Sequence, residues 1–181
     1  ELGLFDDPYK YCDLQREKEI TGSEEINNAA LDIAKKSIVL LKNNNNLLPL
    51  KKEGQKIALI GALASDKTSP LGSWRIAADD NTAISALEGL NQYQGNTVTF
   101  AKGADLTYGK TEFVTELKIN TTDKSEFKKA KEVARNADVV IMILGEHGFQ
   151  SGEGRSRTSL DLPGVQQELL EEIFSVNSNI V

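Results

Sequence analysis

One short stretch of the sequence combines several side chains that could move a proton. Residues 145–157 read Gly-Glu-His-Gly-Phe-Gln-Ser-Gly-Glu-Gly-Arg-Ser-Arg and include Glu146, Glu153 and the only histidine of the chain, His147. Ionisable groups gather at active sites, where their surroundings shift their pKa values. A solvated surface loop can have a similar composition, so the density of charge makes this segment a candidate site and no more.

Glu153 has the local sequence of a mobile proton donor. It lies between Gly152 and Gly154, where the backbone can bend tightly and approach a substrate closely. Arg155 and Arg157 oppose this role, because a nearby cation favours the ionised form of a carboxyl group and a general acid must be protonated. We expect at least one arginine to point away, or burial and a second carboxylate to outweigh them.

Two neighbours are alternatives for the same chemistry. Glu146 directly follows an apolar run, and a residue so close to a strand is typically held by hydrogen bonds, so it ranks below Glu153 as acid/base. For His147, a hydrogen-bonded structural role in the loop is favoured over catalysis.

Composition limits the classes of function. The chain has 181 residues, 39% of them hydrophobic, and a net charge of -6, which argues against nucleic acid or an anionic membrane surface as a partner. One cysteine, Cys12, permits no disulfide within the chain, and one cysteine with one histidine cannot build a conventional zinc site. No apolar run approaches the roughly 20 residues of a membrane helix. We expect no metal, no cofactor and no membrane.

The spacing of apolar residues predicts alternating helices and strands. Residues 1–23 show no sustained period and indicate an extended linker arm, and residues 24–181 indicate an α/β domain. A helix over 24–36 is expected to begin at a capping box between Thr21 and Glu24. The other predicted helices cover 83–90, 127–137 and 166–174, and the predicted strands cover 37–42, 56–61, 97–101, 138–144 and 180–181. This order predicts a three-layer α/β/α sandwich with an open, mainly parallel sheet, truncated at its last strand.

Ligands of open α/β sheets bind beyond the carboxyl ends of the strands. The loops that follow Gly61 and Leu144 are therefore the expected place of a site, and the second of them contains Glu153. A nucleotide-binding module is disfavoured, because Gly61-Ala62-Leu63-Ala64 lacks the glycine pattern of dinucleotide-binding turns.

Several segments in order along the chain resemble glycoside hydrolase family 3 β-glucosidases. Ser151-Gly152-Glu153-Gly154 with Arg157 resembles the acid/base loop of that family, and Leu71-Gly72-Ser73-Trp74 resembles the loop after an earlier strand. Gly3-Leu4-Phe5-Asp6-Asp7-Pro8-Tyr9 resembles the segment that leaves the catalytic barrel. Ser37-Ile38-Val39-Leu40-Leu41-Lys42-Asn43 with Leu47-Leu48-Pro49-Leu50 resembles the start of the second domain.

The resemblance implies a retaining β-glucosidase in which a barrel domain of the same polypeptide supplies an aspartate nucleophile in a Ser-Asp-Trp context. This chain contains no such sequence, and its only Ser-Asp pair, Ser65-Asp66, is followed by Lys67. The resemblance therefore implies that Glu153 is the general acid/base of a shared site, that the substrate is an oligosaccharide or β-glucoside, and that this piece alone is inactive. A non-catalytic carbohydrate-binding or structural domain is the alternative.

The same resemblance suggests roles for Trp74 and Arg157 in binding substrate. Aromatic faces stack on sugar rings, and the alternative for Trp74 is an aromatic that caps the core; Arg75 and Asp79 are candidates by proximity alone. Related bacterial enzymes are commonly exported, so a periplasmic or secreted location is expected. Because Val181 falls at the start of a predicted strand, we also expect the piece to self-associate through an exposed sheet edge.

Overall fold

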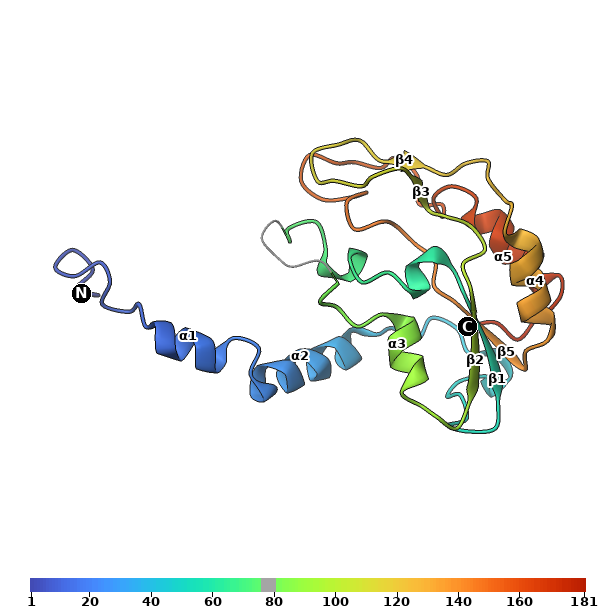
Figure 1. The fold of residues 1–181 in the computed structure, drawn as a ribbon, viewed down its shortest axis with the longest axis horizontal. Helices are drawn as coiled ribbons and strands as arrows, with labels where there is room; N and C mark the ends of the chain where they lie inside the picture. The colour runs from blue at the N-terminus through green and yellow to red at the C-terminus, as the bar shows by residue number, and fades with distance from the viewer. Residues whose placement is uncertain (76–80) are drawn as a thin grey trace. The chain divides into compact units, whose positions relative to one another are not determined.

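The computed structural model describes residues 1–75 and 81–181 (Figure 1). The chain divides into two compact units, Glu1–Asn44 and Asn45–Val181. Asp79 lies outside the described residues. No helix in the described part of the chain is long and apolar enough to cross a membrane.

The first unit contains α1 (Leu14–Ile20) and α2 (Glu24–Ser37), and neither helix has a buried residue. The prediction of an arm without folded elements was wrong at α1, because Asp13 caps this helix by accepting hydrogen bonds from the Gln15 and Arg16 amides at 3.0 Å. One capping side chain can start a helix by accepting hydrogen bonds from its free backbone amides, and the spacing of apolar residues does not reveal such a helix. The predicted α2 is confirmed, but Ser23, not Thr21, caps it: its hydroxyl accepts from the Ile26 amide at 3.4 Å.

The strand predicted over residues 37–42 is absent. Ser37 is the last residue of α2, and Ile38 to Leu41 form no helix or strand and are between 61% and 91% exposed. The apolar side chains of this run predict a buried strand. A strand also needs a hydrogen-bonding neighbour, however, and a local sequence pattern does not specify one. A short 3-10 turn, η1 (Asn44–Asn46), follows.

The second unit is built on a parallel sheet of β1 (Lys56–Ile60), β2 (Thr97–Ala101) and β5 (Val139–Met142), in the order β2-β1-β5. The Ile57 backbone lies opposite Val98 on one side and Val139 on the other. Ile180 forms a parallel bridge with Val140, so the predicted last strand begins where expected. The prediction of an open, mainly parallel sheet is confirmed, and self-association through its edge stays a prediction.

Helices cover both faces of this sheet, as Figure 1 shows: α4 (Phe127–Arg135) and α5 (Gln166–Phe174) lie together on one side, and α3 (Ala86–Asn91) lies on the other. The predicted α5 is confirmed residue for residue, while α3 and α4 are shorter than predicted. Buried side chains of the sheet pack against α4 and α5 in one core; they include Ala58, Ile60, Val140, Ala130, Ala134, Leu169 and Ile173. Burial of each large apolar side chain stabilises the fold by about 1.5–3 kcal/mol.

The polar segment between β2 and α4 contains a small hairpin that the sequence did not predict. It consists of β3 (Thr107–Tyr108) and β4 (Lys118–Ile119), paired antiparallel. Asn120, only 1% exposed, holds its base: the amide nitrogen donates to the Asp105 and Asp123 carbonyls, both at 2.9 Å. The amide oxygen accepts from the Asp123 amide at 2.8 Å and from the Tyr108 hydroxyl. The hairpin is therefore fixed at one buried side chain.

Candidate functional site

The two loops predicted to form a site meet beyond the carboxyl ends of β1 and β5. The loop after β1 contains the turns η2 (Ala62–Ala64) and η3 (Ser69–Leu71), and the amide of Gly148, in the loop after β5, donates to the Ser69 hydroxyl at 3.0 Å. Gly152 has a φ of 119°, and a side chain there would collide with the Ser73 hydroxyl. Glycine at 152 thus permits both the backbone conformation and the close contact between the loops.

The loop after β5 is held at its start by a residue that sequence reasoning missed. Gln166, the first residue of α5, is buried, and its side chain accepts from the Gly145 amide at 2.9 Å and donates to the Gly145 carbonyl at 2.8 Å. It also donates to the Pro163 carbonyl at 2.9 Å. An apolar pattern in a helix gives no sign of such a partner, because Gln166 contacts a residue far away in sequence.

Glu146 is engaged by Arg157. The arginine donates to the Glu146 carboxylate from one nitrogen and to the Asp161 carbonyl, at 2.7 Å, from another. The hydrogen bond from Arg157, with a further one from Ser151, holds the pKa of Glu146 below its ordinary value of 4.5. A carboxyl group that stays ionised is a poor proton donor, so this pairing favours a structural role for Glu146.

Glu153 lies exposed between two glycines with positive φ, 119° at Gly152 and 70° at Gly154. Arg155 turns its guanidinium to two backbone carbonyls, those of Phe113 at 2.7 Å and Thr115 at 2.5 Å. Arg157 bonds to Glu146, so both arginines near Glu153 donate to other partners. The expectation that at least one of them has a different partner therefore agrees with the geometry.

His147 lies in the hydrogen-bonded position expected of a structural residue. Its Nδ1 accepts from the Phe149 amide at 3.1 Å, and its own amide donates to the Gln150 side chain at 3.3 Å. Burial lowers the pKa of His147, the Arg75 cation adds to this effect, and Asp66 opposes it. The imidazole is thus favoured in its neutral form, with Nδ1 occupied as an acceptor.

Asp66 is held in a turn of the loop after β1, and nothing in its surroundings suggests a nucleophile. Its carboxylate accepts from the Thr68 amide at 2.6 Å and the Ser69 amide at 3.1 Å. Burial raises the pKa of Asp66, but the hydrogen bonds from Ser69 and Thr68 outweigh it and hold the pKa below 3.8.

Aromatic residues lie beside this loop. Phe149 is buried, its ring meets that of Phe113 edge-on at 6.0 Å and 76°, and the Arg75 guanidinium lies 4.6 Å from its centroid. Trp74 is 70% exposed, so it does not cap the core of this unit and its ring is accessible to a ligand. Phe113 was not predicted, because nothing in its local sequence indicates a contact with the loop after β5.

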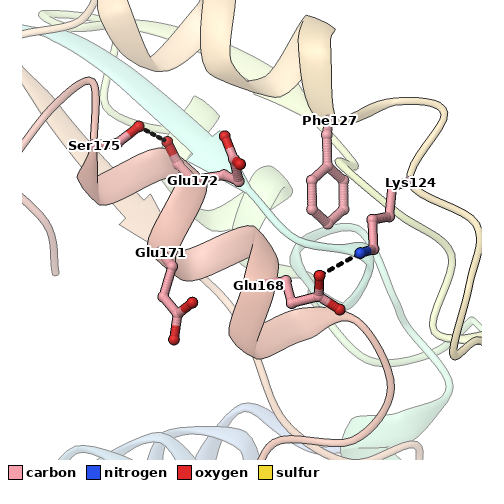
Figure 2. A pocket seen from close by; sticks show the side chains of 6 residues that line it. All are labelled: Lys124, Phe127, Glu168, Glu171, Glu172 and Ser175. Atoms are coloured by element: carbon pink, nitrogen blue, oxygen red, sulfur yellow. Dashed lines mark hydrogen bonds and ion pairs between the residues drawn. The ribbon is translucent and has the colours of Figure 1, made fainter.

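A hollow elsewhere on the second unit does not coincide with these loops. It lies between α4 and α5 and is lined by Lys124, Phe127, Glu168, Glu171, Glu172 and Ser175 (Figure 2). Lys124 forms an ion pair with Glu168 there, and the Ser175 hydroxyl donates to the Glu172 carbonyl at 2.7 Å. These groups satisfy one another. Among the described residues, no group of three or more His, Cys, Asp or Glu side chains could hold a metal ion.

Comparison with known proteins places this geometry in a family. Residues 38–181 match the model of the glycosyl hydrolase family 3 C-terminal domain. A beta-xylosidase of Formosa agariphila is 34% identical over 100% of this chain and 24% of its own length, and a periplasmic beta-glucosidase of Salmonella typhimurium is 31% identical over 100% of this chain and 25% of its own. A β-glucosidase structure from Erythrobacter marinus matches 98% of this chain and 25% of that one, with a TM-score of 0.80 and 29% identity.

The chain spans about a quarter of the length of these relatives. The structural match covers nearly the whole chain, which confirms the α/β sandwich. The family model covers most of the chain, and both relatives match it from end to end. The resemblance inferred from the sequence is confirmed: the chain belongs to glycosyl hydrolase family 3 and contains its C-terminal domain.

Proposed function

We propose that this chain supplies the general acid/base, Glu153, to the active site of a retaining β-glycosidase. The proposal rests on the different surroundings of the two carboxylates in the loop after β5. Arg157 binds Glu146 and lowers its pKa, whereas Glu153 lies exposed on a glycine-flanked turn whose arginine, Arg155, bonds to backbone carbonyls. Glu153 is the carboxyl group that can reach a substrate.

The reaction requires a second carboxyl group, the nucleophile, about 5 to 5.5 Å from the acid/base. We assign it to a barrel domain of the same polypeptide. In the first step Glu153 protonates the departing oxygen while the nucleophile forms a bond to the anomeric carbon. In the second step Glu153 takes a proton from water, whose oxygen displaces the nucleophile, and the anomeric configuration is retained. No step requires a metal or cofactor.

The proposed substrate is an oligosaccharide or β-glucoside with a terminal β-D-glucosyl residue, and the proposed location is the periplasm or outside the cell. The likeness to the Salmonella protein named a periplasmic beta-glucosidase supports both. A β-xyloside is the second candidate, because the Formosa protein named a beta-xylosidase is 34% identical over the whole chain. Trp74, with its exposed ring, is proposed to contact the leaving-group side of the substrate.

The test compares the intact gene product with this chain alone on aryl β-glucosides and aryl β-xylosides. We expect turnover by the intact protein, more on the glucoside, and none by this chain. Glu153→Gln should lower kcat/KM of the intact protein by about 10²–10⁴-fold on a glycoside with a poor leaving group. Glu146→Gln is the matched control. An intact protein that binds sugars without hydrolysing them would instead support a carbohydrate-binding domain.

A further inference from the structure

The turn that carries Glu153 is attached on both of its sides to one short segment of another loop. Before Glu153, the ring of Phe149 packs edge-on against the ring of Phe113 at 6.0 Å. After it, Arg155 donates to the carbonyls of Phe113 and Thr115, at 2.7 and 2.5 Å. Phe113 therefore takes part in both attachments, with its side chain in one and its carbonyl in the other.

The segment that receives these contacts lies between β3 and β4, and the base of this hairpin is fixed. The buried Asn120 bonds to the carbonyls of Asp105 and Asp123 and accepts from the Tyr108 hydroxyl. Its own carbonyl accepts from the Val165 amide at 3.1 Å, immediately before Gln166, the residue that holds Gly145. The hairpin and the start of the loop after β5 are thus joined to the same part of the core.

Fixing both sides matters because the glycines that flank Glu153 place little restriction on the backbone. Gly152 and Gly154 have positive φ and lack side chains that would restrict the backbone. A proton donor must be held close to its working geometry, and misplacement by about 1 Å can cost about 10²-fold in rate. The glycines alone give Glu153 reach but not position.

We infer that Phe113 and Arg155 are positioning residues for Glu153, acting as a clamp formed by the Phe113 ring on Phe149 and the Arg155 guanidinium on the carbonyls of residues 113 and 115. This inference rests on the proposed function of Glu153. The clamp also gives Arg155 a role that does not involve substrate, because two carbonyls receive its hydrogen bonds.

The test uses Arg155→Met, Arg155→Lys and Phe113→Leu in the intact gene product, with Arg135→Met as the control. Arg135 is exposed and lies in the last turn of α4, so its loss removes a similar charge without touching the clamp. kcat/KM is measured on a 2,4-dinitrophenyl glycoside, whose leaving group departs without protonation, and on the methyl glycoside, whose leaving group needs a proton. Thermal melting identifies any variant that does not fold.

Arg155→Met and Phe113→Leu should lower kcat/KM by about 10- to 100-fold on the methyl glycoside and by less than about 3-fold on the dinitrophenyl glycoside. Arg155→Lys keeps a donor for one carbonyl and should lose less than Arg155→Met. Arg135→Met should match the wild type. If Arg155→Met does not fold, the kcat/KM values of Arg155→Lys and Phe113→Leu on the two glycosides test the clamp.

Equal losses on the two glycosides in the folded variants, or no loss, would overturn the clamp. Glu153→Gln separates this failure from that of the proposed function. A leaving-group effect in Glu153→Gln but not in the clamp variants rejects the clamp alone, and its absence from Glu153→Gln rejects the acid/base assignment as well.

Discussion

Arg157 and Glu146 form an ion pair across the loop after β5, and the same arginine donates to the Asp161 carbonyl. The pair joins the two ends of the loop on which Glu153 lies. With the Gln166 side chain on Gly145, it fixes the start and the end of this loop.

Arg157→Met should destabilise the domain by about 1 kcal/mol at pH 7, a modest value because both side chains remain partly exposed to water. The folded pKa of Glu146 is below its ordinary value of 4.5, so the stabilisation is fully present above about pH 4.5 and is lost as the pH falls through the folded pKa. Urea unfolding of the wild type and the variant at pH 7 and pH 3 measures this. A difference in unfolding free energy that grows on acidification would contradict the pairing.

Gln166→Leu should destabilise the domain by about 1–3 kcal/mol, because it leaves the partly buried amide and carbonyl of Gly145, and the Pro163 carbonyl, without the buried Gln166 side chain as their partner. Gln167→Leu is the matched control: Gln167 is exposed, bonds only locally to Glu171 among the contacts described, and should cost less than about 0.5 kcal/mol. Thermal or urea unfolding compares the two variants. Equal effects would show that Gln166 does not hold the loop.

Asn120 should remain without glycan although Asn120-Thr121-Thr122 is a glycosylation sequon. Its side chain is buried and its nitrogen donates to two carbonyls, so the folded protein cannot offer it to a transferase. Mass spectrometry of the chain secreted from a eukaryotic host checks this. Gly109→Asn, which creates a sequon at an exposed glycine with a φ of 72°, is the positive control. A glycan on Asn120 of folded protein would contradict the structure there.

Trp74→Ala should raise KM of the intact protein by about 3- to 10-fold for a disaccharide, with little change for a methyl glycoside, since an exposed aromatic ring contributes about 0.5–1.5 kcal/mol when it packs on a ligand. Because Trp74 is 70% exposed, the melting temperature should change little. An unchanged KM for disaccharides would place Trp74 outside the substrate site.

The sequence predicted those helices and strands whose own residues show a clear apolar spacing or a β-branched run. The run at 56–61 predicted a strand that the structure has at Lys56–Ile60, and the apolar spacing at 166–174 predicted a helix at the observed residues. It failed where the outcome depends on partners: residues 38–41 are apolar but have no strand beside them in the structure, and α1 forms on the cap from Asp13.

The place of the candidate site was predictable, and its internal contacts were not. Parallel strands bring their carboxyl ends to one edge, so the loops after β1 and β5 had to be neighbours. The partners of Arg155 and Gln166, however, are backbone groups distant in sequence. Because every residue has a backbone carbonyl, the residue type does not show which carbonyl will accept a hydrogen bond. The sequence already ranked Glu153 above Glu146, and the pairing of Arg157 with Glu146 adds an argument for this ranking that the sequence could not supply.

The most direct test of Glu153 as the general acid/base is chemical rescue of Glu153→Gly in the intact gene product. Activity on an aryl β-glucoside should fall by about 10²–10⁴-fold, and azide, which attacks the glycosyl-enzyme without needing a base, should restore turnover and yield the β-glycosyl azide. Glu146→Gly should give no such product. Full activity of Glu153→Gly without azide, or azide rescue of Glu146→Gly instead, would contradict the assignment of Glu153 as the acid/base.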